Sequence, residues 1–343
     1  MKRSILSMVM AAGVMCIPGL AMAAAPNVPA GYTIELYASG LPHVQSLAFS
    51  PGGEFGYEGQ LFASYGGDVG HVVRIPSQGV VTYFSPCRDN GAHDLIFAAP
   101  NSAFGPYLYA VQYSSIERYD KNGMRTQFAS VEQQPVDLEF GPGGDWGTYL
   151  YQGDSWGYDG DIDSVRRWDS DGNKTYVLYR GRENIKAIEF GPGGAWGTDL
   201  YLGYGPWPGA NPWPYVEQGG VVKCDPNGNL TDFVLADSNV IGRMGDVAID
   251  PTGKYFGGDM FFSELQYGRI YHVDANGNMS LFMTGMDSYT CIYGGDICFG
   301  PDGAMYLAER VEGNIWRVTP EPGTVALLGL GAAVLVRRRR RRK

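Results

Sequence analysis

The chain has 343 residues, a formal net charge of −10 and only 18% charged residues. Fifty glycines, 21 prolines and 23 tyrosines are typical of short aromatic strands separated by turns, which excludes a helical protein and favours an all-β fold. Length alone would fit two ordinary domains, but repeat folds often run this long as one unit.

The N-terminus predicts a secretory signal peptide over residues 1–23. Lys2 and Arg3 precede an apolar stretch, and the small residues Ala21 and Ala23 form a cleavage site. Export permits disulfides, but the spacing of the remaining cysteines selects no pairing among them. These cysteines are Cys87, Cys224, Cys291 and Cys298.

A repeated segment fills the middle of the chain. FGPGGDWGTYLYQG from Phe140 and FGPGGAWGTDLYLG from Phe190 are near copies. Looser copies begin at Phe49, Phe97, Ile249 and Phe299. Their spacing of roughly 50 residues is the size of one four-stranded blade, so the six copies predict a six-bladed β-propeller over residues 24–319.

Each copy indicates an apolar inner strand, a Gly/Pro turn, an aromatic second strand, a third strand and a fourth strand. The third strands are expected at HVVRI, SIERY, SVRRW, GVVKC, RIYHV and NIWRV, but only five of them are followed by a fourth strand. Residues 32–40 (YTIELYASG) have the missing strand's character and precede the first copy. We therefore expect this segment to complete the last blade and close the ring noncovalently.

The pattern of an apolar inner strand, a PxG turn and a YLY-type second strand resembles the NHL and gluconolactonase-like six-bladed propellers. The resemblance implies the architecture, whereas the mixed Glu/Asn/Asp calcium ligands of the lactonases cannot be placed on this sequence. Residues 31–53 also resemble the opening of quinone-dependent sugar dehydrogenases. The resemblances thus imply two enzymatic alternatives, a Ca²⁺-dependent lactonase-like hydrolase and a quinone-dependent sugar dehydrogenase.

One segment, DSDGN from Asp169, looks like the start of a calcium loop. Its counterparts begin at Asp120, Asp225 and Asp274, always between a third and a fourth strand. The Asn-Gly or Asp-Gly step supplies the positive φ that a tight hairpin needs. These segments therefore predict turns rather than calcium sites.

The irregular connections of the repeat should gather on one face of the propeller, where second strands lead to third strands and each blade leads to the next. We call it the loop face, and we call the opposite face of short PGG and NG turns the turn face. Binding residues often lie on loops that a rigid scaffold holds, although aromatic loop residues also pack against blades. The candidate ligand-binding residues are Trp156, Tyr204, Trp207, Trp213, Tyr215 and His93.

Four copies carry an aspartate at the entry of the inner strand: Asp94, Asp137, Asp246 and Asp296. Ser46 and Ala187 occupy this register in the other two copies. Strands around a common axis would bring the carboxylates together, where they would repel and raise each other's pKa. Either a bound Ca²⁺ ion or a hydrogen bond from each aspartate to the backbone of the next blade would relieve the repulsion.

The chain ends in TPEPGTVALLGLGAAVLVRRRRRRK, which resembles the PEP-CTERM sorting signal of exported bacterial proteins. Within residues 320–343 the matching parts are the motif Pro320, Glu321 and Pro322, a short apolar run and an arginine cluster. The resemblance implies an exosortase-type processing enzyme as partner. It also implies a location at the cell surface, outer membrane or extracellular matrix of a Gram-negative-type bacterium, with membrane contact through this tail only.

Removing both ends leaves a propeller far more acidic than the whole chain, because the signal peptide and the tail carry a surplus of lysine and arginine. This excludes nucleic acid as a partner and favours cations. The sequence contains no nucleophile elbow, phosphate loop or HExxH motif. It therefore favours a noncatalytic surface or matrix protein whose loop face binds a polysaccharide or a surface protein, with the two enzymes as alternatives.

Overall fold

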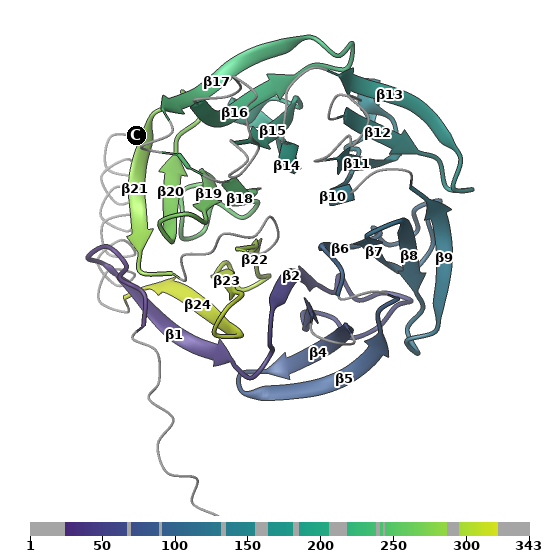
Figure 1. Cartoon of the computed structure of the whole chain (residues 1–343), viewed down its shortest axis with the longest axis horizontal. Helices are drawn as coiled ribbons and strands as arrows, with labels where there is room; N and C mark the ends of the chain where they lie inside the picture. Colours follow the sequence, from purple (N-terminus) through teal and green to yellow (C-terminus); the bar gives the residue numbers. More distant parts are fainter. Residues whose placement is uncertain are drawn as a thin grey trace, which may run out of the picture.

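The computed structural model describes residues 25–66, 70–88, 91–131, 135–154, 164–180, 185–205, 218–237, 241–242, 244–286 and 295–321. Across these ranges the chain is an all-β propeller of six four-stranded antiparallel blades, and none of its described residues is α-helical (Figure 1). The predicted fold class is confirmed. None of the described residues forms a helix long and apolar enough to span a membrane.

The blades follow one another along the chain, and the strands of each blade are named from the inner strand to the outer one. Blade 1 consists of β2 (Val44–Phe49), β3 (Leu61–Tyr65), β4 (His71–Ser77) and β5 (Val80–Pro86). Blade 2 consists of β6 (Asp94–Phe97), β7 (Leu108–Gln112), β8 (Ser115–Tyr119) and β9 (Arg125–Ser130). Blade 3 consists of β10 (Pro135–Phe140), β11 (Leu150–Asp154), β12 (Ser164–Trp168) and β13 (Lys174–Arg180). Blade 4 consists of β14 (Ile185–Phe190), β15 (Leu200–Tyr204), β16 (Gln218–Cys224) and β17 (Leu230–Asp237). Blade 5 consists of β18 (Met244–Ile249), β19 (Met260–Glu264), β20 (Arg269–Val273) and β21 (Met279–Thr284). Blade 6 consists of β22 (Ile297–Phe299), β23 (Met305–Glu309), β24 (Asn314–Pro320) and β1 (Tyr32–Ala38).

The six expected third strands are confirmed as β4, β8, β12, β16, β20 and β24. The second strands β7, β11, β15, β19 and β23 are buried along their whole length. Neighbouring blades cover both of their faces, so they read as continuous apolar runs without polar alternation. Most of the burial therefore lies between blades.

The hydrophobic core of the described residues is divided into clusters that each join two adjacent blades. The two near-identical repeats show how. Trp146, in the short 3₁₀ helix η1 (Gly144–Trp146), packs edge-to-face on Phe190 of the next blade at 4.9 Å. Trp196, in η2 (Gly194–Trp196), donates its indole N–H to the Gly258 carbonyl of blade 5 at 2.6 Å.

The N-terminal strand closes the ring as predicted. β1 pairs antiparallel with β24, from Tyr32 opposite Pro320 to Ala38 opposite Ile315, and lies outermost in blade 6 (Figure 1). The Tyr32 ring also stacks on Phe256 of blade 5 at 5.4 Å. Closure thus adds a complete strand and an apolar contact to the neighbouring blade.

The turn face is built from repeated hairpins. The Asp120 carboxylate accepts the backbone N–H groups of Asn122 and Met124, both at 2.8 Å. The same pair of bonds is found in the turns that begin at Asp169, Asp225 and Asp274. Gly123 has a φ of 78°, and a Cβ there would also clash with the Phe84 carbonyl oxygen of the preceding blade. The glycine is required both by conformation and by the close approach of two blades.

Cys87, Cys224 and Cys298 lie in three different interblade clusters, so none of them pairs with another. Cys291 and the expected signal peptide lie outside the described residues.

Candidate functional site

The inner strands β2, β6, β10, β14, β18 and β22 surround the propeller axis (Figure 1), and the aspartate register joins each strand to the next. The Asp94 carboxylate of blade 2 accepts the backbone N–H of Leu138 in blade 3 at 3.0 Å. The Asp137 carboxylate of blade 3 accepts the N–H of Ile188 in blade 4 at 2.6 Å. Each aspartate therefore bonds to the blade that follows its own.

The same bond recurs on the other side of the axis. The Asp246 carboxylate of blade 5 accepts the N–H of Ile297 in blade 6 at 2.8 Å. The Asp296 carboxylate, just before β22, accepts the N–H of Leu47 in blade 1. The second bond crosses the junction where the chain's two ends meet. It therefore supports the same ring closure that β1 provides at the perimeter.

Two other side chains complete the circuit at the blades that lack an aspartate. The Ser46 hydroxyl of blade 1 accepts the N–H of Leu95 at 2.8 Å. Ala187 of blade 4 has no acceptor, but Glu189, two residues further along β14, accepts the N–H of Ile249 at 3.3 Å. All six blade junctions thus contain a bond from a side-chain oxygen to the next inner strand.

The four aspartates also interact in two carboxyl pairs, Asp94 with Asp137 and Asp246 with Asp296. Burial is the main cause that raises the pKa of all four, and it raises that of Asp246 to about 7. Repulsion within each pair raises the pKa of Asp137 and Asp296 further. The two carboxyls of each pair therefore titrate together rather than independently.

A second acidic level lies next to the aspartates. Burial and the charge of Asp94 raise the pKa of Glu139 to about 8. Burial and the charge of Glu139 raise the pKa of Glu189 well above its ordinary value. The sequence analysis did not single out these glutamates. Their signal was their spacing, because residues two apart on a strand point to the same side.

His93 lies partly buried beside Pro135, in surroundings that favour its neutral form. Burial lowers its pKa to about 4, and the nearby charges of Arg310 and Lys186 act in the same direction, while the bond to Pro135 opposes them. Its Nδ1 lies 2.9 Å from the Pro135 carbonyl oxygen, which can only accept a hydrogen bond. The proton is thus on Nδ1, and Nε2 is the acceptor and a weak base.

The axial donor set fits Ca²⁺ poorly. The ion takes six to eight oxygen ligands, mostly from ionised carboxylates, carbonyls and water. Here the pKa of every aspartate is raised, which disfavours its ionised form, and each aspartate also accepts a backbone N–H. Within the described ranges no group of three or more His, Cys, Asp or Glu side chains has the arrangement of a metal site. These observations do not test calcium binding directly, and calcium at the axis stays a prediction.

Of the five aromatic residues expected to bind a ligand, the described part of the chain contains one, Tyr204. Tyr204 is only 1% exposed and belongs to the core cluster between blades 3 and 4, which corrects its expected exposure on a loop. The cause is that β15 continues to Tyr204, whose hydroxyl lies beside Gly220 of β16. The remaining four candidates lie outside the described residues: Trp156, Trp207, Trp213 and Tyr215.

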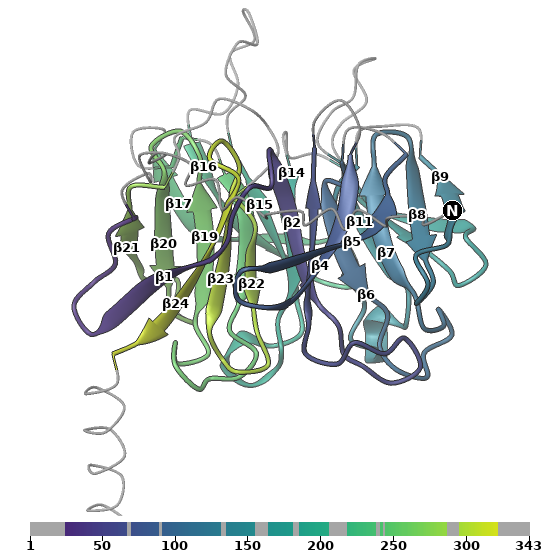
Figure 2. The ribbon, with the colours of Figure 1, turned by 90° about the horizontal axis from the view of Figure 1, so that it is seen from below.

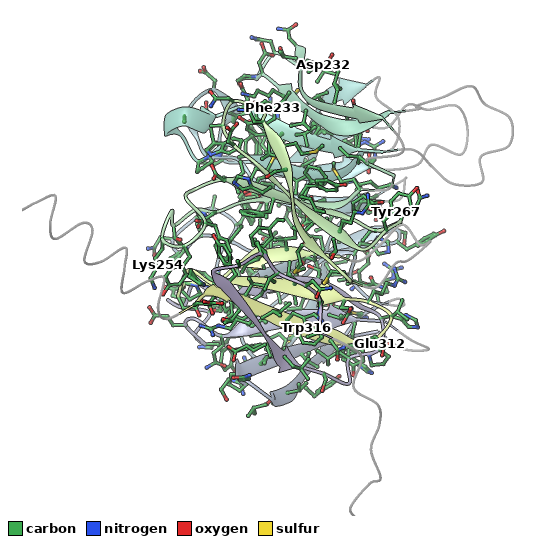
Figure 3. The ribbon with its side chains drawn as sticks, turned by 90° about the vertical axis from the view of Figure 1, so that its left-hand side faces the viewer. Asp232, Phe233, Lys254, Tyr267, Glu312 and Trp316 are labelled. Carbon is green, nitrogen blue, oxygen red and sulfur yellow. The ribbon has the colours of Figure 1, made fainter. Side chains whose placement is uncertain are left out.

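The described part of the loop face presents two other tyrosines. Tyr113, between β7 and β8, is 55% exposed, and Tyr267, between β19 and β20, is 42% exposed. The Arg269 guanidinium lies 4.6 Å from the centre of the Tyr267 ring. Figure 3 shows Tyr267 and Glu312 at one face of the molecule and Lys254 at the opposite face. The connections after second strands therefore carry flat, accessible rings on the side expected from the repeat.

The comparison with protein families concerns the C-terminus. A match to the PEP-CTERM protein-sorting motif covers residues 318–342. The chain carries a PEP-CTERM sorting motif. The match begins inside β24, so the sorting segment overlaps the last blade, and it indicates an exported, surface-associated bacterial protein. No curated protein matches the sequence.

Solved structures share the propeller fold at low sequence identity. A gluconolactonase from Xanthomonas campestris is 12% identical, with 86% of this chain and 94% of that chain covered and a TM-score of 0.60. The PQQ domain of pyranose dehydrogenase from Coprinopsis cinerea is 11% identical, with 86% and 97% covered and a TM-score of 0.60. A streptogramin B lyase is 13% identical, with 84% and 98% covered and a TM-score of 0.54. Likeness at this level shows the fold alone.

Proposed function

We propose that the protein is a noncatalytic, surface-sorted binding protein whose loop face holds a polysaccharide. The sorting motif supports the surface location. The accessible tyrosines of the loop face carry the proposal about the ligand. Tyr113 and Tyr267 offer flat apolar rings with a polar hydroxyl, which is the surface on which sugar rings stack.

The positions of these two tyrosines favour an extended ligand. Tyr113 belongs to blade 2 and Tyr267 to blade 5, which lie on opposite sides of a six-bladed ring (Figure 1). A single sugar could contact only one of them. A polysaccharide chain that crosses the face could contact both, with the rigid ring of inner strands between them fixing the spacing.

The hydrogen bonds of the axial groups hold neighbouring blades together, and this structural role supports a binding protein. Each axial aspartate accepts a backbone N–H group from the next blade. His93 is too weak a base at its lowered pKa of about 4 to remove a proton efficiently at neutral pH. From the names gluconolactonase and pyranose dehydrogenase we take only that this scaffold can accommodate sugar-derived molecules.

The test is calorimetric titration of the purified exported protein with the extracellular polysaccharide of its host. Tyr113→Ala and Tyr267→Ala should each raise Kd by roughly five- to tenfold, because each loses a stacking contact of about 1 kcal/mol. Tyr83→Ala is the matched control, since this tyrosine is 59% exposed but lies on the outer strand β5.

Two results would contradict the proposal. One is the absence of polysaccharide binding by the unsubstituted protein. The other is an equal loss of affinity in the Tyr83→Ala control, which would place the ligand away from the loop face. Turnover of a sugar lactone or oxidation of a sugar by the same preparation would favour the enzymatic alternatives.

A further inference from the structure

The described chain leaves the propeller from the turn face. β24, like every third strand, runs from the loop face to the turn face, and its last residue, Pro320, pairs with Tyr32. The Tyr32 hydroxyl donates to the carbonyl of Tyr255, in the turn between β18 and β19, at 3.3 Å. Figure 2 shows β24 ending at the lower edge of the propeller. The exit point therefore lies among the short turns of blades 5 and 6.

No spacer separates the sorting segment from the fold. The family match starts at Val318, which is fully buried in the cluster between blades 5 and 6. The backbone N–H of Glu321 donates to the carbonyl of Gly31 at 2.9 Å. The apolar run begins at Val325, and the residues between span at most about 14 Å when fully extended. A tail held by a membrane therefore keeps this corner of the turn face close to the lipid surface.

We propose that, while the sorting tail engages a membrane, the short connection turns the turn face toward the lipid and presents the loop face away from it. The importance of the outward face rests on the proposed function, whereas the orientation rests on the exit point and the sorting motif. The partner of the turn face is the lipid surface. The loop face remains open to extracellular polymer.

Charge supports a tethered arrangement over direct lipid binding. Four hairpins of the turn face each begin with a partly exposed aspartate: Asp120, Asp169, Asp225 and Asp274. At the exit corner the Arg317 guanidinium already bonds to Glu35 at 2.6 Å and to Asp302 at 2.8 Å. Anionic lipid headgroups would repel such a face rather than attract it. The length of the connection must therefore set the orientation.

Energy transfer to labelled lipid tests the orientation. A donor dye is attached to Tyr267→Cys on the loop face or to Asn276→Cys on the turn face, at opposite ends of β20. A five-residue strand separates the two positions by about 16 Å or more. The background carries Cys291→Ser and Cys298→Ser, because Cys298 is only partly buried, whereas Cys87 and Cys224 are buried. The exported chain with its intact tail is reconstituted in phosphatidylethanolamine/phosphatidylglycerol vesicles with a headgroup-attached acceptor.

Transfer should be clearly stronger from position 276 than from position 267. A flexible Gly/Ser spacer of roughly 20 residues after Glu321 should abolish the difference, because it frees the propeller to tumble. Equal transfer from both positions without the spacer, or no transfer from either, would overturn the proposal. Persistence of the difference with the spacer would also overturn it. Polysaccharide binding is measured on soluble protein, so failure of that proposal gives a separate result.

Discussion

The two faces of this propeller are built by the same six repeats, yet they differ in regularity. On the turn face, four hairpins use an aspartate in the same way and one glycine in each turn has a positive φ. On the loop face, only the connections β19–β20 and β23–β24 are alike among those that the structure describes, each running from a glutamate to a glycine of positive φ. Two of the described connections expose a tyrosine. Repetition thus marks residues that hold blades together. Departure from repetition marks the surface that is free to differ between blades.

The axis belongs with the regular part of the molecule. One register supplies an interblade bond at five junctions, and Glu189 supplies the bond at the sixth. The carboxyl groups that most resemble an active site in the sequence are therefore part of the ring's framework.

The largest effect is expected from loss of the closing strand. Deletion of residues 32–38 should abolish cooperative unfolding, because it removes the strand that pairs with β24 and the Tyr32 contact with Phe256. Deletion of residues 24–25 should leave the thermal midpoint unchanged, because Ala25 is exposed and the buried Pro26 is kept. Deletion through residue 30 should have an intermediate effect, because Asn27 forms two backbone bonds with Thr284. Circular dichroism melts check this order, and equal midpoints for all three truncations would contradict it.

A turn-face glycine should be the next most sensitive position. Gly123→Ala should destabilise the protein by about 2 kcal/mol or more, because it adds a clash with the Phe84 carbonyl to an unfavourable φ. Gly79→Ala is the matched control: its φ of 74° is similar, but nothing lies within 4 Å of the added Cβ. Urea denaturation of both variants isolates the clash. An equal cost would mean that the two blades do not approach closely at this turn.

The axial carboxyls should make stability depend on pH. Because burial raises the pKa of Asp246 to about 7 and of Glu139 to about 8, the folded state binds more protons than the unfolded chain up to this range. The free energy of unfolding should therefore fall as pH rises from about 6.5 to about 9. Below about pH 6.5, His93 acts in the opposite direction, since burial lowers its pKa to about 4. As pH falls below about 6.5, His93 takes up a proton in the unfolded chain before it does so in the folded protein. The free energy of unfolding therefore falls.

Denaturant melts across this pH range check the slope, and two variants locate its origin. Glu139→Gln should flatten the upper part of the slope, whereas the exposed Glu54→Gln should not. A free energy of unfolding that rises with pH in this window would show that the axial carboxyls do not have a raised pKa in the folded state.

The smallest effect is expected from removal of divalent cations. If hydrogen bonds alone hold the axial aspartates, a chelator and added Ca²⁺ should both leave the melting temperature unchanged. Asp137→Ala should still destabilise the protein by about 1 kcal/mol or more, because it leaves the Ile188 N–H without its acceptor. A melting temperature that rises with Ca²⁺ and falls with chelator would establish the metal site instead.

Repetition explains why most of the framework could be predicted from the sequence. Blade starts and third strands recur at similar spacings, so each copy supports the interpretation of the others. The closing strand follows because one of the six fourth strands is missing from the repeat. The aspartate register was visible for the same reason. The role of Glu189 was not, because it replaces Ala187 from a position two residues away and breaks the alignment. Carboxyl pairing also depends on distances across the axis that spacing along the chain does not give.

The loop face was harder to predict because no repeat constrains it. Tyr204 was expected to be exposed because it precedes an irregular segment, yet β15 continues through it into the core. The two exposed tyrosines, Tyr113 and Tyr267, lie in short connections that composition does not distinguish from the turn face. The start of the sorting segment inside β24 likewise became visible only once Pro320 was seen to pair with Tyr32.

The most direct test of the difference between the faces is one polysaccharide titration of two double variants. The loop-face variant combines Tyr113→Ala with Tyr267→Ala, and the turn-face variant combines Asn122→Ala with Asn276→Ala. The account predicts that Kd rises at least roughly tenfold for the loop-face pair and stays unchanged for the turn-face pair. A loss of affinity confined to the turn-face pair would contradict it.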